Sequence, residues 1–498
     1  MMKYLIRILL LSLCMSTVCK AQDKVQHPTY SKLDDLSGKK VAAITGGYQE
    51  NLLEKNYPQL TVLRIDNSAD MVQALLSKRC EAIVMDDYYY YYYSDNMNKM
   101  EVLEEPLTTT ELGFCFNKDN IELRNQFNDF LKQIKDDGTY DEIYERWIHN
   151  GNSSVMPDIK LPTEGDPLRI ATCATAPPLA FIKDGNLIGL DIEIATRFAA
   201  SLGRPIVLSD MVFSGIIPSL ASGKQDIATA GLSITPERQK AVAFSDPYFS
   251  SPSLIIIRKE NSANHTAYNN EPQNHNFIET VKNSFKRNII EEDRYMMILE
   301  GLKVTASISL MSVIVGTILG ALICWMRMSR HKALYHTAGV YISIMRGTPI
   351  LVLLMIMFYV VFAGTSIDAV TVSIITFGLN FAAYVSEMFR TSIQSVDRGQ
   401  TEAGIALGFT PAQTFCNIVM PQAFMQVLPV YKGEVISLVK MTSVVGYIAV
   451  QDLTKVGDII RSRTFDAFFP LIMVAVLYFI LSWIFATILD LIGKKACR

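Results

Sequence analysis

Hydrophobic and polar positions follow two different patterns along the chain. Between about residues 39 and 150, short apolar runs such as Lys40 to Thr45 and Glu81 to Met85 alternate with stretches of helical periodicity, for example Ala69 to Lys78. A second region of the same kind runs from Leu168 to Arg258. Short strands that alternate with helices are typical of α/β folds with at least some parallel strands. The pattern therefore predicts two α/β lobes.

The pattern changes beyond residue 277, where the apolar runs become longer. Two uncharged runs of membrane-spanning length cover Val304 to Met326 and Ala467 to Leu489. Three weaker runs cover residues 349–363 and 435–450, both extended toward the N-terminus, and residues 369–386. We therefore expect an all-α membrane domain of about five transmembrane helices.

The first 21 residues have the character of an export signal peptide. Lys3 and Arg7 precede an apolar run from Ile8 to Met15, and small and polar residues then lead to Ala21. The residues before Cys19 fit a lipid-attachment box poorly, and whether the signal is cleaved stays open. The signal predicts that the α/β lobes lie outside the cytoplasmic membrane.

The distribution of basic residues agrees with this orientation. Five crossings that begin outside place the C-terminus in the cytoplasm, and cytoplasmic segments carry an excess of Lys and Arg. The segments predicted inside hold Arg327, Arg330, Lys332, Arg346, Arg390, Arg398, Lys494, Lys495 and Arg498, whereas those predicted outside hold Lys455, Arg461 and Arg463. The sequence thus predicts a multi-pass protein of the cytoplasmic (inner) membrane, in contact with membrane lipid.

Composition supports a soluble part joined to a membrane part. The 498 residues are 50% hydrophobic and 19% charged, and the mean hydropathy is +0.21, which is high for an ordinary soluble protein. A formal net charge of −3 gives no support for binding nucleic acid. The eight cysteines are scattered without metal-ligand spacing, so neither a zinc site nor a disulfide framework is expected.

Polar stretches mark the expected domain boundaries. A segment with three prolines joins the two lobes, and a segment rich in Asn reads as a flexible tether before the membrane domain. The expected divisions are the signal peptide 1–21, one lobe 23–150, the linker 151–167, another lobe 168–260, the tether 261–276 and the membrane domain 277–498.

A spaced motif between the third and fourth predicted spans identifies the type of membrane domain. Glu402, Ala403 and Gly404 are followed by Gly408 and, after nine further residues, by a segment that ends in Pro421. This coupling loop, residues 402–421, resembles the cytoplasmic coupling motif of ATP-binding-cassette (ABC) importer permeases, with Gly in place of the second Ala. Gly408 is suited to end the short helix in a left-handed conformation, and Pro421 is suited to open the next helix.

A second signature narrows the resemblance. The stretch from Tyr341 to Val352, with Arg346-Gly-Thr-Pro at its centre, is similar to the start of the second span in the polar amino acid permeases of the histidine, glutamine and arginine type. The similarity extends over essentially all of residues 277–498. Leu353 stands where the family usually has Gln, and Gly433 or Glu434 where it usually has Asn.

The energy source is expected to lie in another chain. No stretch matches the phosphate-binding pattern GxxxxGK[ST], so ATP and Mg²⁺ would be used by a separate cytosolic ABC ATPase, and no cofactor is expected in this chain. A single permease module also predicts a homodimer through the membrane domain, because two modules form the two-fold pathway.

The α/β region carries a resemblance of its own. The stretch from Asp226 to Arg238 resembles lobe one of the type II periplasmic binding proteins for amino acids. The resemblance implies that the backbone at Gly231, the hydroxyl of Ser233 and the guanidinium of Arg238 hold the ligand α-carboxylate. Residues 36–147 resemble lobe two of the same family, which implies that lobe two precedes lobe one in this chain. Either a single circularly permuted domain or two decayed halves of a tandem pair would explain this order.

Three further residues complete the expected ligand site. The resemblance implies that Asp86 holds the α-ammonium and that Phe213 is a stacking platform. Cys173 stands where relatives that read a side-chain amide often carry Asp, and Gly47 replaces a usual Thr. The pocket is therefore expected to be less polar than a glutamine site, so a hydrophobic, small or sulfur-containing amino acid is as plausible as glutamine.

These features together predict a fused substrate-binding and permease subunit of an ATP-driven importer that takes up a small amino acid. Such a subunit is not an enzyme, because the partner hydrolyses ATP. The alternatives are a ligand-gated channel of the glutamate-receptor type and an amino acid sensor that has lost transport.

Overall fold

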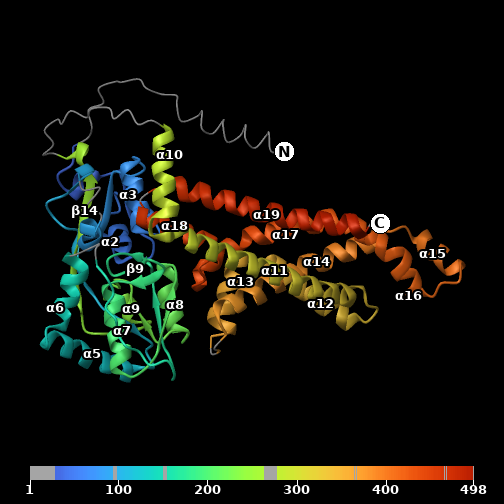
Figure 1. The fold of residues 1–498 in the computed structure, drawn as a ribbon, viewed down its shortest axis with the longest axis horizontal. Helices are drawn as coiled ribbons and strands as arrows, with labels where there is room; N and C mark the ends of the chain where they lie inside the picture. Colours follow the sequence, from blue (N-terminus) through green and yellow to red (C-terminus); the bar gives the residue numbers. More distant parts are fainter. Residues whose placement is uncertain are drawn as a thin grey trace.

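The computed structural model describes residues 29–92, 98–149, 154–262, 277–363, 365, 367–464, 466 and 468–496. An α/β part precedes a helical part of long, roughly parallel helices that extends away from it (Figure 1). The expected signal peptide and most of the tether lie outside the described residues, so the structure says nothing of them.

The first sheet, which we call lobe two, has the strand order β2-β1-β3-β14-β4, with β5 also paired to β14. Strands β1 and β2, like β1 and β3, are parallel, whereas β14 is antiparallel to its neighbours. Apolar residues on both sides of the sheet pack against its helices. The elements are β1 (Lys40–Ile44), α2 (Tyr48–Asn56), β2 (Thr61–Ile65), α3 (Ser68–Leu76), β3 (Ala82–Asp86), α4 (Asp87–Tyr92), β4 (Met100–Val102), β5 (Thr108–Leu112) and β14 (Phe249–Arg258).

The second sheet, which we call lobe one, has the order β11-β7-β12-β6-β13. A smaller antiparallel sheet of β8, β9 and β10 lies beside it. The elements are β6 (Cys115–Phe116), α5 (Ile121–Asp136), α6 (Thr139–Tyr144), β7 (Leu168–Thr172), β8 (Thr175–Ala176), β9 (Ala180–Lys183), β10 (Asn186–Ile188), α7 (Leu190–Ser201), β11 (Ile206–Asp210), α8 (Phe213–Ala221), β12 (Ile227–Ala228), α9 (Pro236–Gln239) and β13 (Ala243–Phe244).

The chain crosses between the lobes twice, which differs from the expected lobe boundaries at residues 150 and 168. After β5 the chain leaves lobe two, and β6 pairs with β12 and β13 of lobe one. After β13 it returns, and β14 pairs with β3, β4 and β5 of lobe two. Each lobe is therefore built from both halves of the α/β sequence, because strand pairing joins segments that are far apart in the chain. The described α/β residues form one two-lobe unit in which each lobe contains strands from both halves of the sequence.

Within lobe one, a buried carboxylate joins the segment after α6 to helix α7. Glu193 on α7 is fully buried and accepts a hydrogen bond of 2.8 Å from the indole N–H of Trp147. The same carboxylate is paired with Arg146 at 2.6 Å and Arg197 at 2.9 Å. Because a buried charge is costly unless it is paired, these partners hold the segment after α6 against α7.

The helical part contains three helices that are long and apolar enough to cross a membrane and two bent helix pairs that pass the same test together. The residues that the structure describes thus form up to five spans, in agreement with the expected all-α membrane domain. One pair bends by 109° between α12 and α13, where Pro349 precedes α13, and the other by 58° before α18. The elements are α10 (Phe277–Phe285), α11 (Arg294–Met328), α12 (Lys332–Gly347), α13 (Ile350–Ile356), α14 (Ala369–Ser395), α15 (Arg398–Ala406), α16 (Pro411–Thr414), α17 (Met420–Met441), α18 (Leu453–Thr464) and α19 (Phe468–Ala496).

Small residues allow α11 and α14 to pack closely. A Cβ atom at Gly316 would lie 2.7 Å from the carbonyl oxygen of Gly378, and one at Gly320 would lie 2.8 Å from Cγ1 of Val385. Only glycine therefore lets the two helices approach this closely, and close packing of small residues is a usual way in which membrane helices gain packing energy, since lipid removes the hydrophobic driving force between them.

Candidate ligand cleft and coupling surface

A narrow cleft separates the two lobes. Its lining comes from the ends of β1, β2 and β3 and the adjoining helices of lobe two, and from the segments after β7 and β12 and the start of α8 in lobe one. The ends of strands are where α/β sheets usually bind ligands. All six residues that the sequence assigns to the ligand site line this cleft: Asp86, Cys173, Phe213, Gly231, Ser233 and Arg238.

The cleft is closed in this structure. The guanidinium of Arg238 in lobe one donates a hydrogen bond of 3.0 Å to the carbonyl oxygen of Gly46 in lobe two. The remaining cavity is about 40 Å³. The two lobes are therefore already drawn together around the site.

Arg238 is held in place by its own helix. The hydroxyl of Thr235 caps α9 by accepting the backbone N–H of Arg238 at 3.2 Å, and Pro236 occupies the first turn. The guanidinium donates to the carbonyl of Ser233 at 3.0 Å and lies 5.6 Å from the ring centroid of Phe213. Burial lowers the pKa of Arg238, but a guanidinium stays charged at neutral pH. It can therefore serve as a planar cation for a carboxylate.

Gly231 is required by its backbone and by its neighbours. Its φ is +62°, and a Cβ atom there would lie 2.7 Å from the hydroxyl oxygen of Tyr88 and 2.8 Å from Cδ1 of Leu179. Its N–H donates to the Asp191 carboxylate at 3.2 Å. This differs from the expected backbone contact with a ligand carboxylate, because that N–H already has a buried acceptor.

Asp191 is a buried neighbour of the cleft that the sequence analysis missed. Its carboxylate is fully buried and also accepts the hydroxyls of Thr229 and Tyr248, each at 2.5 Å. Burial raises the pKa of Asp191 to about 6. The signal for it in the sequence is faint, since Asp191 follows Gly189 at the start of α7 and reads as an ordinary first-turn acid.

Asp86 lies at the end of β3 and is buried. One carboxylate oxygen accepts the amide of Gln49 at 2.8 Å and the hydroxyl of Ser253 at 2.9 Å, while the other accepts Tyr88 at 3.2 Å. Desolvation raises the pKa of Asp86 to about 6, against the lowering effect of these hydrogen bonds. Gln49, Ser253 and Tyr88 were not foreseen from the sequence. They orient the carboxylate and leave it capacity for a further donor.

Two small features shape the rest of the cleft. The thiol of Cys173 is buried and lies 3.1 Å from the hydroxyl of Thr175, which also lines the cleft. A Cβ atom at Gly47 would lie 2.8 Å from the carbonyl oxygen of Ile44. The tight turn before α2 therefore accounts for glycine at this position.

The coupling residues lie at the opposite end of the molecule. Figure 1 shows α15 and α16 at the end of the helical part farthest from the lobes. Glu402, Ala403 and Gly404 lie on α15, and a Cβ atom at Gly404 would lie 2.6 Å from Cγ2 of Thr414. Gly408 has φ +88° and ends α15 in the left-handed conformation, as expected.

Pro421 differs from the expectation that it opens a new helix. It occupies the first turn of α17, but the residues before it, Phe415–Val419, are already helical. The chain therefore runs from α16 into α17 without an extended break. Apolar side chains stay exposed beside α15, with Leu407 77% accessible, so this end presents an apolar knob.

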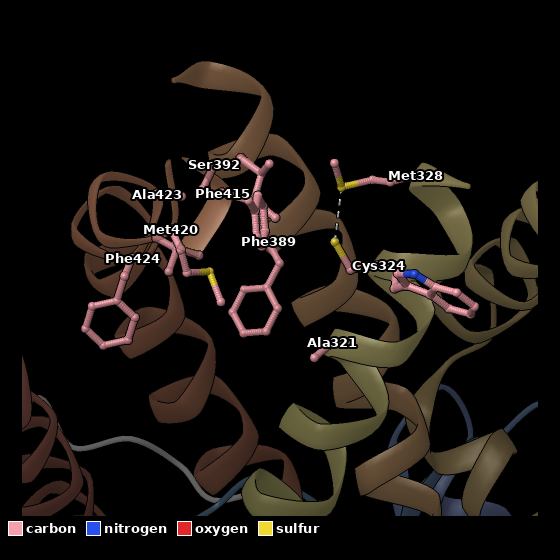
Figure 2. A pocket seen from close by; sticks show the side chains of 12 residues that line it. Ala321, Cys324, Met328, Phe389, Ser392, Phe415, Met420, Ala423 and Phe424 are labelled. Carbon is pink, nitrogen blue, oxygen red and sulfur yellow. Dashed lines mark hydrogen bonds between the residues drawn. The ribbon is translucent and has the colours of Figure 1, made fainter. Parts of the chain in front are cut away.

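A larger apolar cavity of about 450 Å³ lies near the coupling end, between α11, α14 and α17. Figure 2 shows side chains of these helices around it, with Cys324 directed at the sulfur of Met328. Its lining is Ala321, Cys324, Trp325, Met328, Phe389, Ser392, Ile393, Phe415, Met420, Ala423, Phe424 and Val427. Because this lining lacks charged groups, the cavity is unsuited to a zwitterion, and the interlobe cleft remains the candidate amino acid site.

Comparison with known proteins finds relatives of both parts. Residues 21–150 and 168–412 match the bacterial extracellular solute-binding proteins, family 3. The putative glutamine transport system permease protein GlnP of Rickettsia felis is 33% identical over 204 residues, which are 41% of this chain and 94% of that protein. The probable amino-acid ABC transporter permease protein YckA of Bacillus subtilis is 36% identical over 204 residues, 41% of this chain and 90% of that protein.

A solved structure is also similar. The crystal structure of an amino acid ABC transporter with histidines is 33% identical and covers 44% of this chain and 99% of its own, with a TM-score of 0.38.

Proposed function

We propose that this chain is the fused binding and permease subunit of an ATP-driven amino acid importer. The chain belongs to the bacterial extracellular solute-binding proteins, family 3, and to the amino-acid ABC transporter permeases. The lobes lie on the extracytoplasmic side of the cytoplasmic membrane and the C-terminus lies in the cytoplasm. A separate ABC ATPase supplies ATP hydrolysis with Mg²⁺. Two chains pair through the membrane domain to form the pathway.

One observation carries this proposal. A single chain joins a closed interlobe cleft, lined by Arg238, Asp86 and Phe213, to a membrane part that ends in the Glu402 to Gly408 knob. A cation and a carboxylate that face one narrow cleft match the two charges of an amino acid. A stiff knob at the other end provides a surface through which an ATPase can push.

The cleft residues divide the ligand between them. The guanidinium of Arg238 and the hydroxyl of Ser233 hold the α-carboxylate, and Asp86 holds the α-ammonium. Phe213 and Cys173 face the side chain. Gly231 keeps the space beside Tyr88 open. When the ATPase closes, the Glu402 to Gly408 helix moves and switches access, and the tether keeps the lobes at a local concentration of order millimolar near the pathway.

The test uses two variants of the full chain, reconstituted in liposomes with its ATPase. Arg238→Ala should abolish amino acid binding, because the cleft loses its cation. Gly408→Asp should leave binding intact and remove the stimulation of ATP hydrolysis by ligand, because a Cβ and a charge disturb the left-handed end of α15. The two variants are controls for each other. Normal uptake in either variant would contradict the role given to that residue, and ligand-evoked current without ATP would revive the channel alternative.

A further inference from the structure

Helix α18 lies where the helical part meets both lobes. Figure 1 shows it beside α3, at the junction of the two parts. It packs against α3 of lobe two, β8 of lobe one, and the membrane helices α11 and α19. Ile459 on α18 is fully buried against Ala174 and Ile182 of lobe one. One helix of the membrane part thus touches both sides of the ligand-binding unit.

The contact with lobe one is buried. The ammonium of Lys455 lies 3.3 Å from a carboxylate oxygen of Asp210, and the two side chains are 5% and 2% exposed. The same oxygen accepts the backbone N–H of Ala174 at 2.7 Å. Ala174 stands between Cys173 and Thr175, which line the ligand cleft. Lys455 therefore connects to the cleft lining of lobe one through Asp210 and Ala174.

Further contacts reinforce this side. The ammonium of Lys224 in lobe one donates to the carbonyl of Thr365 at 2.9 Å, and the Tyr359 hydroxyl in the helical part donates to the carbonyl of Gly215 at 3.4 Å. Removing one partner of a buried ion pair leaves an uncompensated charge, which is strongly unfavourable. Lobe one is therefore fastened to the helical part at several points.

The contact with lobe two is more open. The guanidinium of Arg461, two turns after Lys455, lies 2.6 Å from Asp70 on α3, and the side chains are 14% and 26% exposed. Arg461 is also 3.0 Å from Asp458 on its own helix, so it keeps an anionic partner if Asp70 moves away. Asp70 in turn accepts the side-chain amide of Asn67 at 2.8 Å, and Asn67 lines the cleft.

We propose that α18 is a closure clamp with two unequal ends. Lys455 anchors lobe one through Asp210, and Arg461 latches lobe two through Asp70. Both ends bind together only when the lobes are drawn close, as they are here with Arg238 bonded to Gly46. The latch opens first, because water reaches it and Asp458 retains Arg461. Lobe two then swings while lobe one stays docked. That this swing releases an amino acid rests on the proposed function, but the clamp itself does not.

The experiment measures the distance between the lobes in the full chain, in lipid nanodiscs without ATPase or ligand. Spin labels are attached through non-cysteine chemistry at the exposed positions of Lys55 in lobe two and Gln239 in lobe one. In Arg461→Ala and Asp70→Ala we expect a second, longer distance that is weak or missing in the unsubstituted chain. The double variant should match either single variant, because the two residues act as one unit.

Two controls separate the latch from a general loss of charge. Arg461→Lys keeps the cation and should restore the short distance. Arg204→Ala removes an ion pair with the exposed Asp166, which lies far along the chain from α18. This variant should leave the distance between the lobes unchanged. A near-native thermal transition shows that each variant is folded. Distances in Arg461→Ala identical to those of the Arg204→Ala control would overturn the clamp, as would additive effects of Arg461→Ala and Asp70→Ala.

A second readout follows ligand release. With whichever of the twenty amino acids saturates the unsubstituted chain in calorimetry, Arg461→Ala should release it about five- to ten-fold faster, because a partly exposed ion pair that holds the lobes together is lost. An unchanged release rate would overturn the statement that opening of the clamp releases the ligand. If no amino acid binds the unsubstituted chain, the proposed function fails, while the distance measurement still decides on the clamp.

Discussion

Replacing Asp86 by Asn should stabilise the lobes and abolish their ligand binding. Desolvation raises the pKa of Asp86 to about 6, from an ordinary value near 3.9. Holding the carboxylate ionised at neutral pH therefore costs roughly 3 kcal/mol, at about 1.4 kcal/mol per pKa unit. Asn retains the acceptor for Gln49 and Ser253 and turns its N–H₂ to Tyr88, so most of the hydrogen bonds survive without the charge. We expect a gain of about 1–3 kcal/mol in the free energy of unfolding.

The size of the stability gain depends on pH. Well below pH 4 the carboxyl is protonated in both the folded and the unfolded state, and Asp86→Asn should change the free energy of unfolding little. As the pH rises toward 6, the unfolded state ionises first, so the unsubstituted protein loses stability relative to the variant. Above about pH 6 the gain should be complete. Ligand affinity should show the opposite dependence, because only ionised Asp86 holds an ammonium, and it should fall up to tenfold per pH unit below 6.

The assay follows the fluorescence of Trp147, which is fully buried in lobe one, during thermal unfolding of the full chain between pH 4 and 8. Trp325 and Trp483 are replaced by Phe so that the signal reports the lobes. Binding is measured by calorimetry on the same samples. Asp166→Asn is the matched control, because that carboxylate is 90% exposed and pairs with Arg204 at the surface. A variant at position 86 that is less stable than the control at pH 7, or that binds ligand normally, would refute the reasoning.

Two further substitutions probe the packing of each part. Gly320→Leu should prevent close contact of α11 with α14, because even a Cβ atom at position 320 would lie 2.8 Å from Cγ1 of Val385. We expect the variant to have a lower thermal stability in detergent. An unchanged melting profile would count against the contact. Glu193→Ala should lower the free energy of unfolding by about 3–5 kcal/mol, because it leaves Arg146 and Arg197 unpaired beside a buried cavity. Denaturant unfolding monitored by Trp147 fluorescence measures this loss. A loss below about 1 kcal/mol would show that the network contributes little.

Local sequence determined much of the candidate site. Thr235, Pro236 and Arg238 form a capped helix start through contacts within three residues, so the position of the guanidinium follows from the motif itself. Gly408 adopts a left-handed φ that few other residues tolerate, and this follows from its place after a short helix. The long apolar runs were enough to predict the membrane spans, because a helix needs about twenty mostly apolar residues to cross the hydrocarbon core.

Tertiary structure decided which of these pieces meet. The crossing of the chain between the lobes depends on β6 and β14 pairing with distant strands, and pairing partners leave no trace in the alternation of apolar residues. Gln49 and Tyr88 line the cleft, and Asp191 lies behind Gly231; all three are ordinary polar residues in sequence, and their role depends on burial that only the tertiary structure provides. Arg461 meets Asp70 across 391 positions. The sequence by itself determined the groups that can bind an amino acid and span a membrane, whereas the closed cleft and the helix that grips it depend on long-range packing.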